Sequence, residues 1–184
     1  MRRTICLLVL SLASSLAASA QEMKRGGYAG EERRQIKSLS AEEVEALLNG
    51  RGMGLARAAE LNHYPGPLHV LELAAELRLT PEQRTQTQVV FERMRGEAVR
   101  LGRQIVERER ELDAMFAKGE IDERKLHAAT AGIARLQGEL RAAHLSAHLE
   151  MRRLLSPQQV SKYDELRGYA AGHKPGGQHG HGKH

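Results

Sequence analysis

Two histidines in the second half of the chain, His144 and His148, have a spacing that suits metal binding. Residues i and i+4 face the same side of an α-helix, so both imidazoles can reach one ion, and Met151 follows one turn later. Further ligands would come from histidines and carboxylates elsewhere: Glu60, His63, His69, Glu139 and Glu150. The alternative is a half-exposed pair without a ligand role, because two ligands are fewer than the four that zinc usually takes.

Four more histidines stand among glycines at the C-terminal end of the sequence: His173, His179, His181 and His184. Imidazoles on a flexible segment bind zinc, copper or nickel weakly and release them readily. We expect residues 172–184 to be a disordered tail that binds metal weakly; the alternative is an inert solubilising tail. His127 has no partner at ligand spacing, so we expect it to be structural or on the surface.

No combination of residues indicates catalysis. The sequence has no nucleophile elbow, no phosphate-binding loop and no His-Glu-x-x-His motif. Its one cysteine, Cys6, excludes an internal disulfide and a cysteine-based zinc site. We therefore expect a binding protein without an organic cofactor, and not an enzyme.

The first 20 residues are typical of a cleavable signal peptide. Met1-Arg2-Arg3 is positively charged, residues 5–16 are apolar, and Ala18-Ser19-Ala20 fits the cleavage rule. We expect export to the periplasm and a mature chain that begins at Gln21. After cleavage no apolar run is long enough to cross a membrane, so we expect no membrane span.

The composition favours an all-α protein. Of 184 residues, 41% are hydrophobic but only 3% are aromatic, and the formal net charge is +5. Few aromatics disfavour most β-sandwich and barrel cores, and alanine, leucine, glutamate and arginine are common in helices. Nucleic-acid binding is not expected, because the signal-peptide pattern predicts export and no aromatic residues are interleaved with the basic ones for base stacking.

Start and stop signals predict a long antiparallel helical hairpin. Thr80-Pro81-Glu82-Gln83 begins a helix that runs to about Lys118 and is ended by Gly119. Asp122 begins the second helix, and Ser156-Pro157-Gln158-Gln159 begins a last short one. Each long helix would be roughly 50 Å in length. We expect a flexible arm over 21–38 and a helical domain over 39–171, with short helices before the hairpin.

Apolar residues at 3–4 spacing mark the expected inner seam of each long helix. They are Phe91, Met94, Ala98, Leu101, Ile105, Leu112 and Met115 in the first helix and Leu126, Ala129, Ile133, Leu136, Leu140, Ala143, Ala147 and Leu154 in the second. A bare hairpin leaves part of these stripes open, so the short helices or a second chain must cover them. We expect a homodimer.

The two helix-start motifs, Leu79-Thr80-x-x-Gln83 and Leu155-Ser156-x-x-Gln159, bracket the hairpin. This arrangement resembles the twin Leu-Thr-x-x-Gln motifs of the Spy/CpxP family of periplasmic proteins. The segment from Gly52 to Leu71 is similar to the branch of heavy-metal sensors and zinc-resistance-associated proteins, and the likeness covers residues 40–170. The alternative is that the motifs only cap helices and fix the corner.

The resemblance implies a cradle-shaped hairpin dimer whose concave face receives clients. It implies an ATP-independent chaperone that binds unfolded proteins in envelope stress and is modulated by metal. The alternative is a zinc, copper or nickel sensor, or a buffering resistance protein, with an envelope-stress sensor as partner. A sensor usually needs tethering, so the cleaved signal peptide favours a chaperone or a buffer.

Basic residues are frequent along both long helices, and a positive concave surface would attract acidic unfolded clients. Flexible or exposed apolar side chains would then hold the clients loosely. The expected client-binding residues are Met94, Arg103, Met115 and Phe116. The alternative is a solvated charged face with ion pairs between residues three or four apart.

Overall fold

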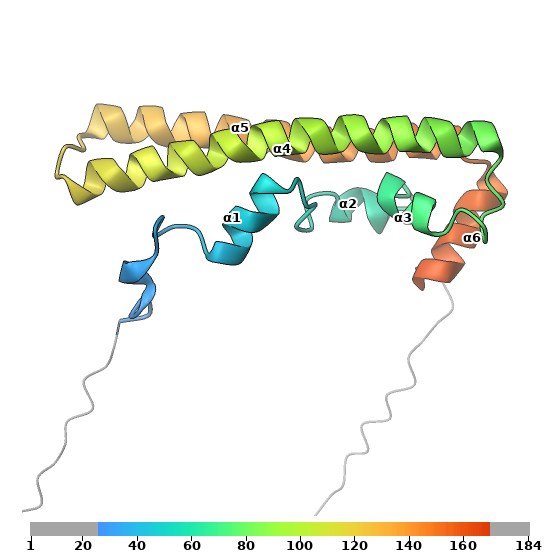
Figure 1. Cartoon of the computed structure of the whole chain (residues 1–184), viewed down its shortest axis with the longest axis horizontal. Helices are drawn as coiled ribbons and strands as arrows, with labels where there is room; N and C mark the ends of the chain where they lie inside the picture. Colours follow the sequence, from blue (N-terminus) through green and yellow to red (C-terminus); the bar gives the residue numbers. More distant parts are fainter. Residues whose placement is uncertain (1–25, 170–184) are drawn as a thin grey trace, which may run out of the picture. The chain divides into compact units, whose positions relative to one another are not determined.

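Two long helices form an antiparallel hairpin, α4 (Pro81–Ala117) and α5 (Glu123–Leu154) (Figure 1). The structure is a computed structural model, and it describes residues 26–169. The helices have 37 and 32 residues, and Thr80 and Asp122 cap them as the sequence predicts. Residues 26–169 contain α-helices and no strand, so the all-α prediction with a long hairpin is confirmed.

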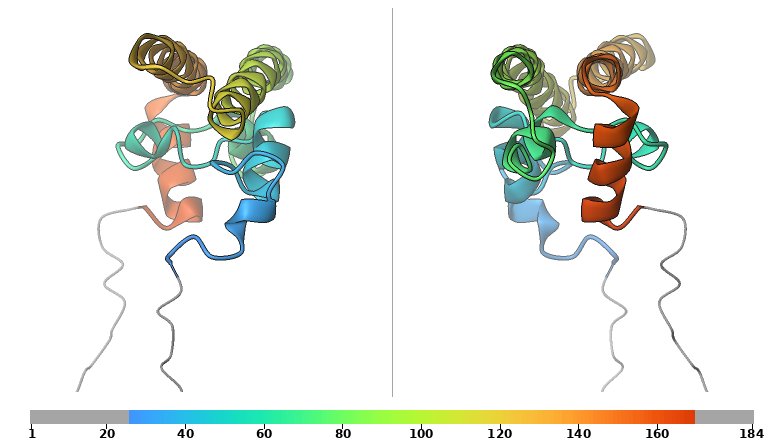
Figure 2. Two further views of the ribbon diagram at one scale, coloured as in Figure 1. Left: turned by 90° about the vertical axis from the view of Figure 1, so that its left-hand side faces the viewer. Right: turned by 90° about the vertical axis from the view of Figure 1, so that its right-hand side faces the viewer.

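Four short helices lie on one face of the hairpin: α1 (Ala41–Leu48), α2 (Arg57–Glu60), α3 (Pro67–Glu72) and α6 (Pro157–Arg167) (Figures 1 and 2). Helix α1 packs on α4, α2 packs on α5, and α3 contacts both long helices. Within the described residues a 3₁₀ turn, η1 (Glu31–Arg33), precedes them in the sequence, and residues 26–32 belong to a separate unit. None of the helices within 26–169 combines the length and the apolar character needed to cross a bilayer.

The inside of the hairpin holds two apolar clusters. The first joins α1 to the middle of both long helices, and it contains Ile36, Leu47, Ala98, Leu101, Ile105, Val106, Leu136 and Leu140. The second joins α3 and α6 to the open end of the hairpin, and it contains Val70, Leu77, Val90, Ala147, Met151, Leu155, Val160 and Tyr163. The segments before α4 and after α5 therefore supply about half of the core.

The expected seam is correct in the middle of the hairpin and wrong towards its tip. Leu112, Met115, Leu126 and Ala129 are only partly buried. The clusters reach no further towards the tip than Val106 and Ile133–Leu136, because no short helix packs beyond that point. Phe91, Met94, Ala143 and Leu154 are also only partly buried, and they lie on the flanks of the seam.

The expected flexible arm over 21–38 is too long at its C-terminal end. Ile36 is buried in the first cluster. Lys37 forms an ion pair of 3.0 Å with Asp113, and the Ser38 hydroxyl donates a 2.7 Å hydrogen bond to Glu109. Residues 36–38 therefore pack on α4, and the packed domain begins before residue 39; residues 21–25 lie outside the described part.

The twin motifs bind each other through their glutamines. The Nε2 of Gln83 donates to the Oε1 of Gln159, and the Nε2 of Gln159 donates to the Oε1 of Gln83, both at 2.9 Å. Each second Nε2 hydrogen goes to a backbone carbonyl near the other motif, that of Leu154 for Gln83 and that of Leu77 for Gln159.

Each glutamine also caps its own helix. Gln83 Oε1 accepts the Thr80 N–H at 3.1 Å, and Gln159 Oε1 accepts the Ser156 N–H at 2.9 Å. The hydroxyls of Thr80 and Ser156 accept the backbone N–H of the glutamine in return. All donors and acceptors of the two partly buried amides are thus satisfied, and the start of α4 is joined to the start of α6.

A backbone contact at Gly102 sets how closely α1 approaches α4. A Cβ added to Gly102 would lie 2.0 Å from the Leu47 carbonyl oxygen and 2.7 Å from its carbon. Replacing Gly102 by alanine therefore has to displace backbone, and we expect Gly102→Ala to lower the free energy of unfolding by at least about 2 kcal/mol in chemical denaturation.

The matched controls are Gly96→Ala in α4 and Gly138→Ala in α5, where an added Cβ meets nothing within 4 Å. Both should raise the free energy of unfolding by about 0.5–1 kcal/mol, because alanine favours helix more than glycine does. A Gly102→Ala protein as stable as these controls would contradict the close approach of α1.

One substitution distinguishes the contribution of the Gln83–Gln159 hydrogen bonds to stability from the contribution of helix capping. Gln83→Glu keeps a side chain that caps well at the third helical position, but it removes both amide donors and places a carboxylate against Gln159 Oε1. We expect it to lower the free energy of unfolding by about 2 kcal/mol.

The control is Glu43→Gln in the exposed capping box of α1, where Glu43 accepts the Ser40 N–H at 2.8 Å. The change there should stay within about 0.5 kcal/mol, as for most surface substitutions. Equal, small effects in both boxes would mean that Gln83 acts only as a cap.

Candidate metal centre

The two histidines of the predicted metal pair lie inside the protein. His144 is 3% exposed and His148 is 7% exposed, and both belong to the inner face of α5. The alternative interpretation, a half-exposed pair, is therefore wrong. The expected seam had Ala143 and Ala147 at its centre. In the structure the buried face of α5 is centred on the histidines instead, so Ala143 lies on its flank while Ala147 stays buried.

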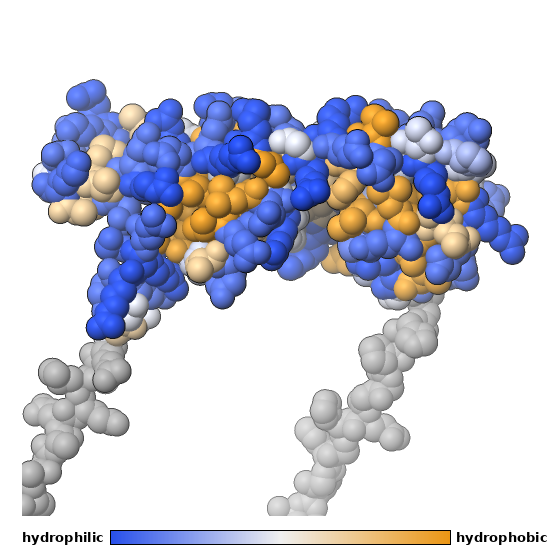
Figure 3. Space-filling view, viewed as in Figure 1, coloured by the Kyte–Doolittle hydropathy of each residue, from blue (hydrophilic) through white to orange (hydrophobic). Residues whose placement is uncertain are grey.

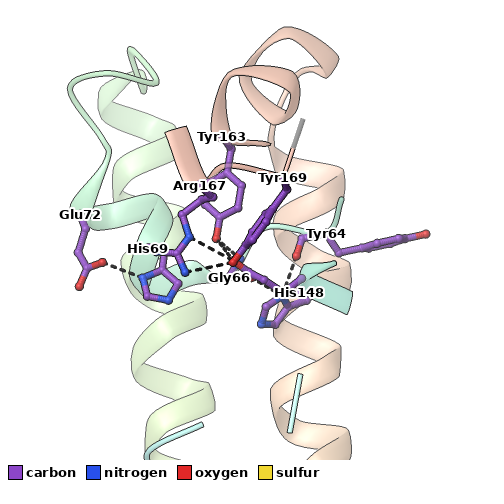
Figure 4. Close-up of polar contacts among 9 residues, drawn as sticks. Tyr64, Gly66, His69, Glu72, His148, Tyr163, Arg167 and Tyr169 are labelled. Atoms are coloured by element: carbon purple, nitrogen blue, oxygen red, sulfur yellow. Dashed lines mark hydrogen bonds and ion pairs between the residues drawn. The ribbon is translucent and has the colours of Figure 1, made fainter. Parts of the chain in front are cut away.

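A backbone carbonyl holds the ring of His148. Its Nδ1 lies 2.7 Å from the carbonyl oxygen of Tyr64, which can only accept, so Nδ1 carries the hydrogen (Figure 4). With the hydrogen on Nδ1, Nε2 is the nitrogen that can offer a lone pair to a ligand. A histidine whose other nitrogen donates to a carbonyl is the usual arrangement in metal sites, because the bond fixes the tautomer and the ring orientation.

The ring of His144 is buried without a partner for one of its nitrogens. Its Nε2 is shielded from solvent and forms no hydrogen bond within residues 26–169. Burial lowers the pKa of His144, and the neighbouring His148 lowers it further. His144 is therefore held neutral, which is the protonation state that a metal ion requires.

The backbone lies against the two rings at Gly52 and Gly66, and the approach is tight enough to favour glycine only at Gly66. A Cβ on Gly52 would stand 3.9 Å from Cε1 and Nδ1 of His144. A Cβ on Gly66 would stand 3.0 Å from Cε1 and 3.3 Å from Nε2 of His148. The loop before α2 and the turn before α3 thus form the wall that faces the pair.

A partly buried polar network around Glu60 lies beside His148; Figure 4 labels its members Tyr163, Arg167 and Gly66. Glu60 Oε1 accepts a 2.5 Å hydrogen bond from the Tyr163 hydroxyl and lies 3.5 Å from Arg167 Nε. The other oxygen of Glu60 lies 3.6 Å from His148 Nδ1. The Tyr163 hydroxyl in turn accepts the Gly66 N–H at 3.4 Å, and burial together with Glu60 raises the pKa of Tyr163.

The pair opens on a cavity of about 810 Å³ between the hairpin and the short helices. Its lining combines apolar side chains with arginines and the polar groups just described. The lining includes Met53, Leu61, Leu68, Phe91, Met94, Arg51, Arg57, Arg95, Glu60, His69, His144, His148, Arg167 and Tyr169. Its size falls in the range of small-molecule and cofactor sites.

The other predicted ligands are not brought to the pair. His63 is paired with Asp164 at 2.8 Å, and His69 is paired with Glu72 at 2.8 Å. Met151 is fully buried in the second apolar cluster. Across residues 26–169 no three or more His, Cys, Asp or Glu side chains are grouped so that they could hold a metal ion.

The two glutamates proposed as completing ligands form ion pairs on the surface, Glu139 with Arg135 and Glu150 with Arg93, both at 2.5 Å. Only Glu60 of the wider set comes close to the pair. The histidines of the C-terminal tail, His173, His179, His181 and His184, lie outside the described residues.

The expected client-binding residues do not gather in one patch. Met94 lines the cavity, whereas Met115 and Phe116 lie 21 and 22 positions further along α4, roughly 30 Å away. Phe116 is 56% exposed and Met115 is partly buried. Arg103 is exposed, and many charges near it form the short-range ion pairs of the alternative, such as Arg100 with Glu97.

Sequence reasoning missed the contribution of α6 to the site. Tyr163 and Arg167 follow Val160 by three and seven residues, so a helical wheel places all three on one face. Polar side chains on the inner face of a short helix were the available signal. No sequence pattern could have indicated the contact between His148 and the Tyr64 carbonyl, because every residue has a backbone carbonyl.

A family model described as heavy-metal resistance matches residues 46–162, which include α4, α5, both twin motifs and the histidine pair. No curated protein and no solved structure matches the chain. The family match covers more than half of the 184 residues and agrees with the resemblance to the Spy/CpxP proteins. This protein therefore belongs to the heavy-metal resistance family.

Proposed function

We propose that this protein binds a zinc, copper or nickel ion through His144 and His148 and acts as a metal sensor or metal buffer. The observation that carries the proposal is the buried pair of imidazoles, one of which, His144, keeps an unpartnered nitrogen in the described part of the chain. Membership of the heavy-metal resistance family supports it.

The type of ligand atom, imidazole nitrogen, suits such an ion. Imidazole suits zinc, copper and nickel, and the bond from His148 to the Tyr64 carbonyl fixes a ligand-competent tautomer. A bound ion would supply a localised positive charge that accepts the lone pairs of His144 and His148. Glu60, close to His148, would offset part of this charge.

We further propose the periplasm as the compartment and a homodimer as the working form. The compartment rests on the signal-peptide pattern of residues 1–20, which lie outside the described part. The dimer rests on the tip of the hairpin, where apolar residues such as Leu112 and Leu126 are only partly covered. An envelope-stress sensor is the proposed partner for a signalling role.

Calorimetric titration of the chain over residues 21–184 with Zn²⁺, Cu²⁺ and Ni²⁺ tests the metal proposal. We expect at least one of these ions to bind, and His144→Gln and His148→Gln each to weaken that binding at least tenfold, because each removes one imidazole. Binding should also weaken at acidic pH, since protons compete with the ion for the imidazole nitrogens; the lowered pKa of His144 delays this loss to more acidic pH.

His127→Gln is the matched control. His127 lies on the same helix, its side chain is 75% exposed, and it is far from the pair in sequence. It should leave the affinity unchanged. Unaltered binding in both pair variants, with their helical content preserved, would refute the metal role of His144 and His148.

A second function, ATP-independent chaperoning of unfolded proteins, is favoured by exposed apolar residues at the cavity. Leu61 is 55% exposed and Leu68 is 43% exposed, and both line the cavity with Met94. Apolar areas lie over α1 and α3 on the face viewed in Figure 3. Such surface gives unfolded segments a place to bind without nucleotide.

Light scattering of an aggregating client protein tests the chaperone proposal. At equimolar ratio, without nucleotide, we expect the chain to suppress aggregation and the double variant Leu61→Ser/Leu68→Ser to suppress it at most half as well. Leu166→Ser, an exposed leucine of α6 that does not line the cavity, is the control. Full activity in the double variant would argue against the cavity as the client site.

A further inference from the structure

The large cavity carries more positive than negative charge. Its described lining contains four arginines and one carboxylate, that of Glu60. Two of the arginines are compensated, since Arg167 lies 3.5 Å from Glu60 and Arg51 lies 2.5 Å from Glu45. The other two arginines leave an excess of positive charge on the lining, which a negatively charged group in the cavity would offset.

These two arginines, Arg57 and Arg95, have free guanidinium groups. Both residues are exposed, and within residues 26–169 neither side chain forms a hydrogen bond or an ion pair. A Cβ on Gly54 would stand 3.3 Å from a terminal nitrogen of Arg57, so this guanidinium lies against the loop before α2. A guanidinium presents a planar fork of N–H donors that matches the two oxygens of a carboxylate.

Apolar side chains form another part of the same lining, and they suit a hydrocarbon chain. They are Met53, Leu61, Leu68, Phe91 and Met94. A hydrocarbon chain can cover them without burying an unpaired polar group, whereas an enclosed peptide backbone would need hydrogen-bond partners that they lack. The two methionines are unbranched and flexible, so they can adapt to the shape of such a chain.

The free arginines lie towards one end of the cavity. The chain from α1 through α2 to α3 runs along the hairpin in the direction opposite to α4 (Figure 1). On α2, Arg57 comes before Leu61 and so lies nearer to α1. On α4, Arg95 comes four residues after Phe91, about 6 Å further towards α1. The contact of α1 agrees, because a Cβ on Gly50 would stand 3.1 Å from the Arg95 carbonyl oxygen.

We propose that this cavity binds a single-chain amphipathic anion of the class of medium-chain fatty carboxylates. Arg57 and Arg95 hold its carboxylate at the end towards α1, and its hydrocarbon chain extends past Leu61 and Phe91 towards α3. The cavity volume of about 810 Å³ is within the range of pockets that enclose small organic ligands. The inference goes beyond the proposed metal and chaperone functions and depends on neither.

Calorimetric titration of the chain over residues 21–184 with decanoate tests the proposal. A metal chelator is present, and decanoate stays below the concentration at which it forms micelles. We expect one decanoate to bind per chain. Octanoate should bind about tenfold more weakly, because each buried CH₂ contributes about three- to fourfold to the affinity. The uncharged analogue 1-decanol should bind at least about fivefold more weakly, because it lacks the carboxylate.

The double variant Arg57→Gln/Arg95→Gln tests where the carboxylate binds. It should weaken decanoate at least about fivefold and leave 1-decanol unchanged, because only the charged partners are removed. The matched control is Arg84→Gln/Arg124→Gln, which removes two exposed arginines of the hairpin that do not line the cavity. The control should keep the affinity for decanoate within about twofold, since distant exposed charges are screened by salt.

The variant Leu61→Ser tests where the hydrocarbon chain binds. It should reduce the advantage of decanoate over octanoate, because part of the apolar surface that the longer chain covers is removed. Leu166→Ser, at an exposed leucine outside the cavity, should leave this advantage unchanged. Circular dichroism of each variant confirms that the helices are intact.

The remaining outcomes overturn the inference in distinct ways. Absence of decanoate binding would remove the ligand site, while the metal titration and the aggregation test use other probes and are judged on their own. Equal affinity for decanoate and 1-decanol, or equal losses in the two arginine variants, would overturn anion recognition by Arg57 and Arg95. Binding to vesicles of anionic phospholipid without binding of monomeric decanoate would assign the arginines to a membrane surface instead.

Discussion

The paired amides of Gln83 and Gln159 are the constraint on which the rest of the structure depends. Four hydrogen bonds link the two motifs to each other and to the ends of the neighbouring segments. The bonds form only if α4 starts level with the end of α5, because a shift of one residue along a helix moves a side chain by about 1.5 Å and rotates it by about 100°. The corner therefore fixes the register of the hairpin.

That register determines what the inner face of α5 meets. Leu140 belongs to the first apolar cluster and Ala147 to the second, and His144 lies between them. His144 thus lies in a polar interval between two apolar cores, and His148 follows within the span of the second, opposite the loop and turn that contain Gly52 and Gly66. Leaving a buried nitrogen of His144 unpartnered costs about 1–3 kcal/mol, so this interval is less stable than an apolar filling would be.

The sequence predicts the hairpin well because its signals are local. Capping residues, prolines at the first helical position and apolar spacing define α4, α5 and α6 within a residue or two. The histidine spacing identifies the pair for the same reason. The burial of the pair, the bond between Gln83 and Gln159 and the role of Glu60 with Tyr163 all depend on which segments meet across 76 to 103 residues. Periodicity contains no information about such contacts, so the sequence left a half-exposed histidine pair open as an alternative. For the same reason the predicted flexible arm includes residues 36–38, which pack on α4.

The polar groups around the pair also form a continuous connection to the C-terminal end of the domain. His148 donates to the carbonyl of Tyr64, the N–H of Gly66 two residues later donates to the Tyr163 hydroxyl, and Tyr163 donates to Glu60. Arg167 lies against Glu60 and holds Tyr169. A ligand of His148 can shift the position of the C-terminal end only if these contacts differ between two conformations of the protein and the ligand binds one conformation more tightly. The links differ in length: the bonds of His148 to Tyr64 and of Tyr163 to Glu60 are 2.7 and 2.5 Å, whereas the contacts of Gly66 and Arg167 are 3.4–3.5 Å. A change in the orientation of the His148 ring is therefore opposed most strongly at Tyr64, and Tyr169 lies at the other, looser end of the same network.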